Sequence, residues 1–287
     1  ASYYHKISHE GYLRHLLVRR AENTGEILVN LVTTSQEEWD LMPLVQEVLG
    51  LPLEGKVVGF LHIINDSLAD VVKSDETKVL YGQDYFYEEL LGLKFKITPF
   101  SFFQTNSLGA EVLYSTAREF VGETKDRTIF DLYSGTGTIA QILAPVAKEV
   151  IGVELNRDAV KDAVINAKRN NIKNEQFYNA DAGKFMVELS EQNKKVDVVF
   201  MDPPRAGSDE AFLSSVVKLA PKKVVYMSCN PETLARDLKY LTRHGYQAVE
   251  CQPCDMFPFT KHVECVCLLT KPHEAKHHVN ATPDMDR

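Results

Sequence analysis

The sequence predicts a doubly wound, Rossmann-like α/β domain preceded by a smaller α+β domain. From about residue 99, apolar strand candidates alternate with helical stretches, a pattern typical of a mostly parallel sheet. Residues 1–98 instead hold β-branched runs and a single helical stretch. Acidic residues or a cysteine follow five successive strand candidates of the α/β region, at the edge where open α/β sheets bind ligands.

The domain limits follow from this change of pattern. We expect the α+β domain over residues 1–98, the α/β domain over residues 99–272 and a disordered tail over residues 273–287, which are polar with two prolines. In the first domain "EILVNLVTT" and "KVVGFLHIIND" predict strands. The helix between them is expected to begin after an N-cap at Ser35 and to end at Gly50.

The α/β region contains seven strand candidates, with helical stretches such as "NRDAVKDAVINAKRNN" and "SDEAFLSSVVKLA" between them. The strand candidates, in chain order, are "TIFDLY", "EVIGVEL", "EQFYNAD", "VDVVFMD", "KKVVYMS", "YQAVECQ" and "VECVCLL".

The composition limits the classes of partner and compartment. The chain has 287 residues and a net charge of −8, which opposes bulk attraction to nucleic acid, so an RNA partner would need a local basic surface. No apolar run reaches the ~18 residues that span a bilayer, and we expect no membrane association. Five cysteines do not suggest a disulfide framework and fit a cytoplasmic protein.

The segment "DLYSGTGTIA" predicts a cofactor-binding turn. Glycines at 135 and 137 allow a positive φ and close approach of a ligand, but the same letters fit a dinucleotide fingerprint and leave a nicotinamide cofactor open. Asp131 and Asp181 favour S-adenosylmethionine, because acids would repel a pyrophosphate and could meet a cationic amino group and an adenine. Asp181 could instead cap a helix. We expect Glu154, at the next strand end, to bind a ribose.

The segment "SCNPETLARDL" places Cys229 where a strand ends, and "DMFPFTKHVECVCLL" places Glu264 at the start of another strand. Methylation of a pyrimidine at C5 requires a nucleophile that adds to C6 and a base that later removes the C5 proton. A thiolate and a carboxylate meet these requirements, provided that the strand of Glu264 runs antiparallel to its neighbours. Cys229 could instead be a buried thiol, Glu264 a solvated acid of an edge strand, and we expect His262 to be structural.

Four motifs, "FFQTN", "DPPRAG", "SCNPETLARDL" and "DMFPFTKHVE", resemble the RNA uracil-5-methyltransferase family over roughly residues 10 to 270. The resemblance implies a class I methyltransferase domain, S-adenosylmethionine as cofactor, and an RNA substrate that is 23S rRNA rather than tRNA. It implies Cys229 as nucleophile and Glu264 as base. The cofactor-site residues that it implies are Gln104, Tyr133, Thr138, Glu154, Asp181 and Asp202, of which Asp202 could instead contact the uracil.

The chain departs from that family in lacking an N-terminal β-barrel RNA-binding domain and a four-cysteine iron–sulfur site, so we expect a catalytic fragment or a short form. Two further readings remain: an NAD-dependent oxidoreductase and a non-catalytic RNA-binding fragment. A zinc site formed by Cys251, Cys254, Cys265 and Cys267 is disfavoured, because the last two alternate along an apolar strand. We therefore expect no metal.

Overall fold

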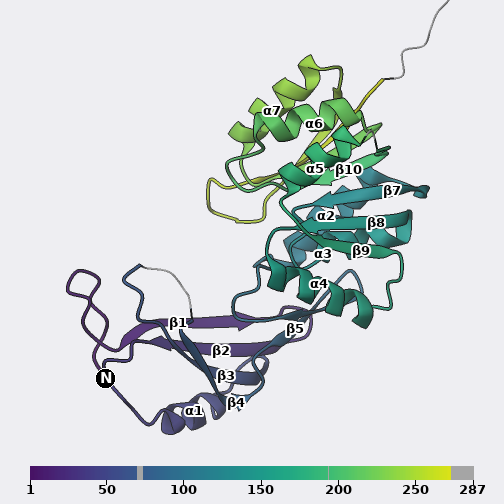
Figure 1. Cartoon of the computed structure of the whole chain (residues 1–287). Helices are drawn as coiled ribbons and strands as arrows, with labels where there is room; N and C mark the ends of the chain where they lie inside the picture. Colours follow the sequence, from purple (N-terminus) through teal and green to yellow (C-terminus); the bar gives the residue numbers. More distant parts are fainter. Residues whose placement is uncertain (70–73, 193, 273–287) are drawn as a thin grey trace, which may run out of the picture.

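The computed structural model describes residues 1–69, 74–192 and 194–272, which form two lobes joined by a hairpin and a connecting segment (Figure 1). The tail predicted over residues 273–287 lies outside the described residues. In the first lobe, four strands lie in the order β1-β2-β3-β4. They are β1 (Leu13–Arg20), β2 (Glu26–Thr33), β3 (Lys56–Ile64) and β4 (Glu76–Gly82). Strands β2 and β3 are parallel, because helix α1 (Met42–Leu49) crosses between them.

Helix α1 begins later than the sequence analysis expected. Its N-cap is Leu41, so the predicted N-cap at Ser35 is wrong. Pro43 lies in the first turn, where its missing N–H and fixed φ are tolerated. The backbone N–H of Ser35 donates instead to Asp66 across the lobe (2.8 Å). The predicted end at Gly50 is confirmed.

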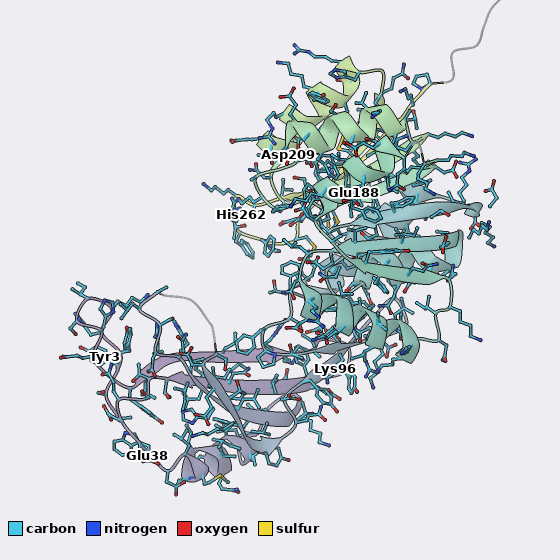
Figure 2. The ribbon with its side chains drawn as sticks, viewed as in Figure 1. Tyr3, Glu38, Lys96, Glu188, Asp209 and His262 are labelled. Carbon is cyan, nitrogen blue, oxygen red and sulfur yellow. A yellow bond between two sulfur atoms is a disulfide. The ribbon has the colours of Figure 1, made fainter. Side chains whose placement is uncertain are left out.

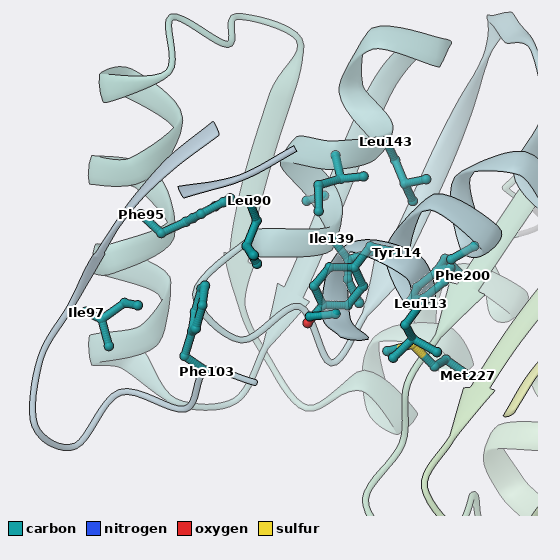
Figure 3. Packing of buried hydrophobic residues seen from close by; sticks show 14 of the residues in the cluster. Leu90, Phe95, Ile97, Phe103, Leu113, Tyr114, Ile139, Leu143, Phe200 and Met227 are labelled. Carbon is teal, nitrogen blue, oxygen red and sulfur yellow. The ribbon is translucent and has the colours of Figure 1, made fainter. Parts of the chain in front are cut away.

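The hairpin of β5 (Phe86–Leu90) and β6 (Leu93–Ile97) connects the lobes. It packs on the second lobe against helices α2 (Ser107–Val121), α3 (Thr138–Leu143) and α4 (Arg157–Arg169). A single hydrophobic core therefore contains side chains from both sides of the predicted limit at residue 98. Figure 3 shows this cluster extending from Phe95 of the hairpin, past Phe103 and Tyr114 of α2, to Phe200 of the large sheet.

The second lobe is built on a seven-stranded sheet in the order β12-β13-β11-β10-β7-β8-β9. Its strands are β7 (Thr124–Leu132), β8 (Ala147–Glu154), β9 (Glu175–Asn179), β10 (Val198–Met201), β11 (Lys223–Ser228), β12 (Gln247–Cys254) and β13 (Glu264–Thr270). The remaining helices are the 3₁₀ turn η1 (Ala144–Val146), α5 (Ala182–Glu191), α6 (Glu210–Leu219) and α7 (Pro231–Arg243).

Both faces of this sheet are buried. Alternate strand residues point to opposite faces, so Val198 packs with the core of α2 and α3, whereas Val199 packs with that of α5, α6 and α7. The chain moves outward from β7 through β8 to β9 and then returns to add β10 on the other side of β7. This reversal confirms the predicted doubly wound, Rossmann-like fold and makes the β7/β10 boundary the expected ligand site.

Strand β13 runs antiparallel to both of its neighbours, β11 and β12. Its first residues therefore lie at the carboxyl end of β11, where Ser228 is paired with Cys265. Every other neighbouring pair in the sheet is parallel. This single reversal satisfies the condition on which the pairing of Cys229 with Glu264 depended.

A disulfide was not predicted from the sequence. Cys251 and Cys267 are direct partners across β12 and β13, with Cα atoms 4.1 Å apart, and they form a disulfide. Sequence spacing did not show this proximity, which the strand register creates. Two of the four thiols of the zinc alternative are thereby used, and no group of three or more metal-binding side chains occurs in the described ranges. In that same part of the chain, no helix is long and apolar enough to cross a membrane.

Candidate active site

A cavity of about 1160 Å³ opens at the carboxyl ends of the strands. Its wall includes the ends of β8 and β11, the turns after β7 and β10, and the start of β13. The labelled His262 in Figure 2 belongs to its wall and lies on the side of the second lobe that faces the first. Seven of the eight predicted site residues line the cavity: Gln104, Tyr133, Glu154, Asp181, Asp202, Cys229 and Glu264. Thr138 does not.

Cys229 lies between the end of β11 and the start of α7. Asn230 is the N-cap of that helix and accepts from the N–H of Glu232 (3.1 Å), while Pro231 occupies the first turn. The proline after the cysteine is thus a helix-start signal, and the cap holds the thiol at the exit of the strand. Cys229 is half-buried and reaches the cavity, so it is not an enclosed core thiol.

Glu264 lies next to Cys229 through the strand register. Ser228 is paired with Cys265 in antiparallel register. The next residues along, Cys229 and Glu264, therefore meet at the same edge of the sheet. Glu264 is only 5% exposed, which rules out a solvated edge-strand acid. Burial raises its pKa above the usual range for a glutamic acid.

Three groups near this edge influence one another's protonation. Burial and the neighbouring charges of Glu264 and Asp202 raise the pKa of the Cys229 thiol, against the smaller opposing effects of a backbone hydrogen bond and Arg205. Burial, and then Glu264, raise the pKa of Asp202 to about 8. The thiol is therefore protonated at neutral pH, and a base must accept its proton before sulfur can act as a nucleophile.

The turn after β7 is shaped by two glycines. Gly135 (φ +54°) lines the cavity, and a side chain there would project into open space that a ligand could use. Gly137 (φ +77°) packs against Phe177 and Ala163, so even a methyl group would clash at 2.9 Å. The N–H of Gly135 donates to Glu154 (3.0 Å), which also accepts from Asn156 (2.7 Å). This arrangement fixes the Glu154 carboxylate at the cavity wall.

The charge of the cavity suits a cationic ligand better than an anionic one. Only one arginine, Arg205, and one histidine, His262, line it. Six acidic side chains line it, Glu154, Asp158, Asp162, Asp181, Asp202 and Glu264, of which Asp202, with a pKa of about 8, is largely neutral at pH 7. A pyrophosphate would be repelled here, whereas the sulfonium and amino groups of S-adenosylmethionine would be attracted.

Asp131, near the end of β7 and beneath the glycine turn, also favours a cationic ligand. It is fully buried behind the cavity wall, and neither carboxylate oxygen makes a well-formed hydrogen bond among the described residues; the backbone N–H of Ala140 gives the charged form only a weak stabilisation. Burial, followed by the charge of Asp202, raises its pKa well above the usual range. A buried acid without a partner costs stability, so an amino group brought by a ligand would remove that cost. The residues present therefore fit S-adenosylmethionine.

Comparisons with known proteins agree with this geometry. A family model described as tRNA (Uracil-5-)-methyltransferase matches residues 64–272. Over 264 residues, 92% of the chain, the sequence is 53% identical to an uncharacterized RNA methyltransferase of Clostridium tetani. The chain belongs to the uracil-5-methyltransferase family.

Relatives of this family extend beyond the chain. It spans 57% of the C. tetani protein and 59% of an uncharacterized RNA methyltransferase of Caldanaerobacter subterraneus that is 49% identical over 94% of the chain. The solved Pyrococcus abyssi tRNA (uracil-54, C5)-methyltransferase, in complex with S-adenosyl-L-homocysteine, is 34% identical with a TM-score of 0.77. That match covers 92% of this chain and 61% of the other. A putative methyltransferase from Streptococcus mutans, 12% identical with a TM-score of 0.59 over 86% of this chain and 69% of its own, shares the fold.

The family motif "DPPRAG" forms a loop that α7 holds in place. The carbonyl of Arg205 accepts from Asn230 and Thr233 (both 3.2 Å). The buried Asp237 accepts from the N–H of Ser208 (2.8 Å) and the hydroxyl of Tyr226 (2.6 Å). Asp202 and Cys229 are therefore placed by one rigid unit of loop and helix.

The family motif "FFQTN" contributes to the cavity and to a second loop. Phe103 is buried against Phe95, and Gln104 lines the cavity. Asn106 caps α2 by accepting from Gly109 (2.9 Å), and its amide donates to the carbonyl of Met256 (3.1 Å). It thereby connects helix α2 to the loop that leads to Glu264.

The other predicted residues have mixed positions. Asp181 lines the cavity and is also the N-cap of α5, accepting from Lys184 (2.9 Å). Tyr133 has a positive φ of 70°, and burial raises its pKa to about 12. Thr138 is buried at the start of α3, facing Thr136 (3.4 Å) rather than the cavity.

Sequence reasoning missed the apolar and polar rim of the cavity. Phe100 and Phe102 line it although they are 48% and 74% exposed, and Phe257 contributes from the loop before β13. Asp158 and Asp162 line it from the first turns of α4. Aromatic residues at a rim look like core residues in a sequence, so only the acids next to the Glu154 strand end offered a signal.

Proposed function

We propose that the chain methylates C5 of a uridine in RNA, with S-adenosylmethionine as the methyl donor. The observation that carries this proposal is the meeting of Cys229 and Glu264 at one edge of the sheet, inside a cavity whose acids fit the cofactor. When bound, S-adenosylmethionine supplies an electrophilic methyl group. Glu154 and Asp181 would hold its nucleoside, and Asp131 its amino group.

Cys229 would act first as the nucleophile. Its sulfur forms a bond to C6 of the uracil, and the electron pair of the C5–C6 double bond moves toward C5 and O4. The thiol proton must leave before this step; the ionised Glu264 beside it can accept that proton and pass it to solvent, so that Glu264 is ionised again when it later acts as base. The resulting enolate makes C5 nucleophilic enough to take a methyl group.

Glu264 would act last as the base. It removes the proton from the methylated C5, the C5–C6 double bond reforms, and the carbon–sulfur bond breaks to release Cys229 as thiolate. Its position on the antiparallel β13 supports this role, because that reversal brings a carboxylate to the thiol. The target base has to leave its stack to enter such a cavity.

The class of RNA is a finer proposal. We propose 23S rRNA in the cytoplasm, because "GYLRHLLVRRAENTGEILVNLVTT" resembles the rRNA enzymes of the family. A tRNA uridine is the second candidate, favoured by the name of the P. abyssi enzyme. Incubation with each purified RNA and nucleoside mass spectrometry for 5-methyluridine would separate the two.

Release of tritium from RNA labelled at uridine C5 tests the reaction itself. We expect release with the wild-type chain, none with Cys229→Ala, and release with Cys254→Ala, which removes a half-buried thiol outside the cavity wall. Full activity of Cys229→Ala would overturn the mechanism. RNA binding without tritium release would favour a non-catalytic fragment, and stabilisation by NADH but not by S-adenosylhomocysteine would favour the oxidoreductase.

A further inference from the structure

Three cations gather on two tyrosines of the β5–β6 hairpin. The Nζ of Lys96 lies 4.2 Å from the ring centre of Tyr85. The Nζ of Lys94 and the guanidinium of Arg169 lie 4.5 and 4.8 Å from the ring centre of Tyr87. The two rings pack edge to face at 5.3 Å. We call these five residues the cationic hairpin surface.

The cationic hairpin surface is held rigidly by α4. Asn170 accepts from the backbone N–H of Lys94 (2.9 Å) and donates to its carbonyl (3.1 Å). Asn166 accepts from the backbone N–H of Lys96 (2.9 Å) and from Arg169 (3.0 Å). These bonds fix the backbone of both lysines and the guanidinium of Arg169, and the contacts with Tyr85 and Tyr87 place the two ammonium groups.

The positive charge of this surface is not neutralised by ion pairs. Across the described ranges, Lys94, Lys96 and Arg169 form none within 4.0 Å, whereas Lys125 and Lys195 each pair with a carboxylate. The nearby acids are Glu89, the cross-strand partner of Lys94, Asp84 beside Tyr85, and Asp162, whose pKa burial raises against a smaller opposing effect of Lys96. Aromatic rings attract a cation without cancelling its charge, so the surface remains available to an anion.

The surface leads directly to the cavity. From Lys96 the chain continues to Thr98 and Ser101, which line the cavity, and Ser101 donates to Asp162 of α4 (3.3 Å). Asp162 and Arg169 are seven residues apart on α4, about 10 Å along the helix axis. Figure 2 shows Lys96 at the junction of the two lobes, below the second. One or two nucleotides could cover this distance.

The cavity creates a need for such a surface. Its carboxylates repel phosphates, and the chain as a whole carries a net charge of −8. Affinity for nucleic acid comes mainly from phosphate contacts with lysine and arginine. We propose that Lys94, Lys96 and Arg169, held on Tyr85 and Tyr87, bind the phosphodiester backbone of the RNA where it leaves the cavity. This inference rests on the proposed function.

The test is equilibrium binding of a fluorescein-labelled, uridine-containing RNA stem–loop to the 287-residue chain at several salt concentrations. The triple variant Lys94→Gln, Lys96→Gln, Arg169→Gln should bind on the order of 10- to 100-fold more weakly, and the slope of log affinity against log salt should fall by about 2. A matched control with the same loss of charge is Lys125→Gln, Lys195→Gln, Lys222→Gln, at the opposite ends of the strands. We expect this control to bind within about twofold of wild type.

Two measurements show whether the triple variant is still folded and still binds the cofactor product. The melting temperature and S-adenosylhomocysteine affinity of the triple variant should match wild type, and if Arg169→Gln disturbs α4, the pair Lys94→Gln, Lys96→Gln replaces it. Equal RNA affinity and equal salt slope in variant and control would overturn the proposal.

The outcome is separable from that of the proposed function, because binding requires no methyl transfer. If the wild type forms no 5-methyluridine but the triple variant loses affinity, the surface stands and the reaction fails. If the wild type methylates RNA and the triple variant binds like the control, the reaction stands and the surface fails.

Discussion

Two buried carboxylates, one at the junction of the lobes and one beneath the cavity, differ in their hydrogen bonds. Glu88 of the hairpin is 1% exposed and accepts from the N–H groups of Glu22 (2.7 Å) and Asn23 (3.0 Å) and from the hydroxyl of Ser107 (2.6 Å). It ties the β1–β2 turn, the hairpin and α2 together. Asp131 is equally buried, yet neither of its oxygens makes a well-formed hydrogen bond among the described residues.

We expect this difference to separate a structural carboxylate from one that binds a ligand. A carboxylate that the protein satisfies by itself stabilises the fold and has no capacity left for a ligand. One left unsatisfied weakens the free protein and gains its partner only on binding, which makes it selective for a cation. Both residues are acidic and buried, and only their hydrogen bonds distinguish them.

The largest expected effect concerns Glu264, on the functional side. Glu264→Gln keeps the shape but removes the base, so methyl transfer should fall roughly 10²- to 10⁴-fold. RNA should remain covalently attached to Cys229 and appear as a slower band on denaturing gels. Glu250→Gln, an exposed acid on β12, is the control and should leave the rate unchanged. Absence of the adduct together with wild-type turnover would remove Glu264 from the mechanism.

The next effect concerns Glu88, on the structural side. Glu88→Ala leaves four donors without an acceptor, the three named above and the backbone N–H of Glu89, and the free energy of unfolding should fall by about 3 kcal/mol. Denaturant unfolding measures this loss. The S-adenosylhomocysteine affinity of the folded variant should stay close to wild type. A selective loss of that affinity would mean that Glu88 is not a purely structural residue.

Asp131→Asn should show the reverse pattern. The amide stays close in size but cannot neutralise a cationic amino group, so S-adenosylhomocysteine should bind about 10-fold more weakly by titration calorimetry. The melting temperature of the free chain should not decrease, because no well-formed hydrogen bond of the native protein is lost. A lower melting temperature with unchanged affinity would make Asp131 a structural residue.

A pH-dependent effect concerns Glu175 on β9, an acid outside the cavity wall whose carboxylate oxygens have no hydrogen-bond partner among the described residues. Burial raises its pKa from 4.5 to about 8, so the folded chain retains a proton that the unfolded chain has lost between these values. Stability should therefore fall as pH rises from about 5 to 8. Glu175→Gln should reduce that slope in melting temperatures measured across the range, and a slope identical to wild type would contradict the assignment.

The sequence predicted this architecture because strands and glycine turns are local signals. "DLYSGTG" and "SCNP" each combine a buried strand with its turn, so Tyr133 and Cys229 could be placed at strand ends. Other features depend on register between distant segments. The Cys251–Cys267 disulfide, the missing partners of Asp131 and the rings beneath Lys94 and Lys96 arise only after the strands pair. Helix α1 was misplaced because Pro43, not Ser35, sets its start.

Asn106 mechanically couples two segments beside the cavity. Its side chain grips the first turn of α2 with one atom and the carbonyl of Met256 with the other. Any displacement of the segment before β13 that admits a nucleotide must either break this tether or drag α2 with it. Gln104, two residues before Asn106, lines the cavity, so such a movement would also change the shape of the cavity wall.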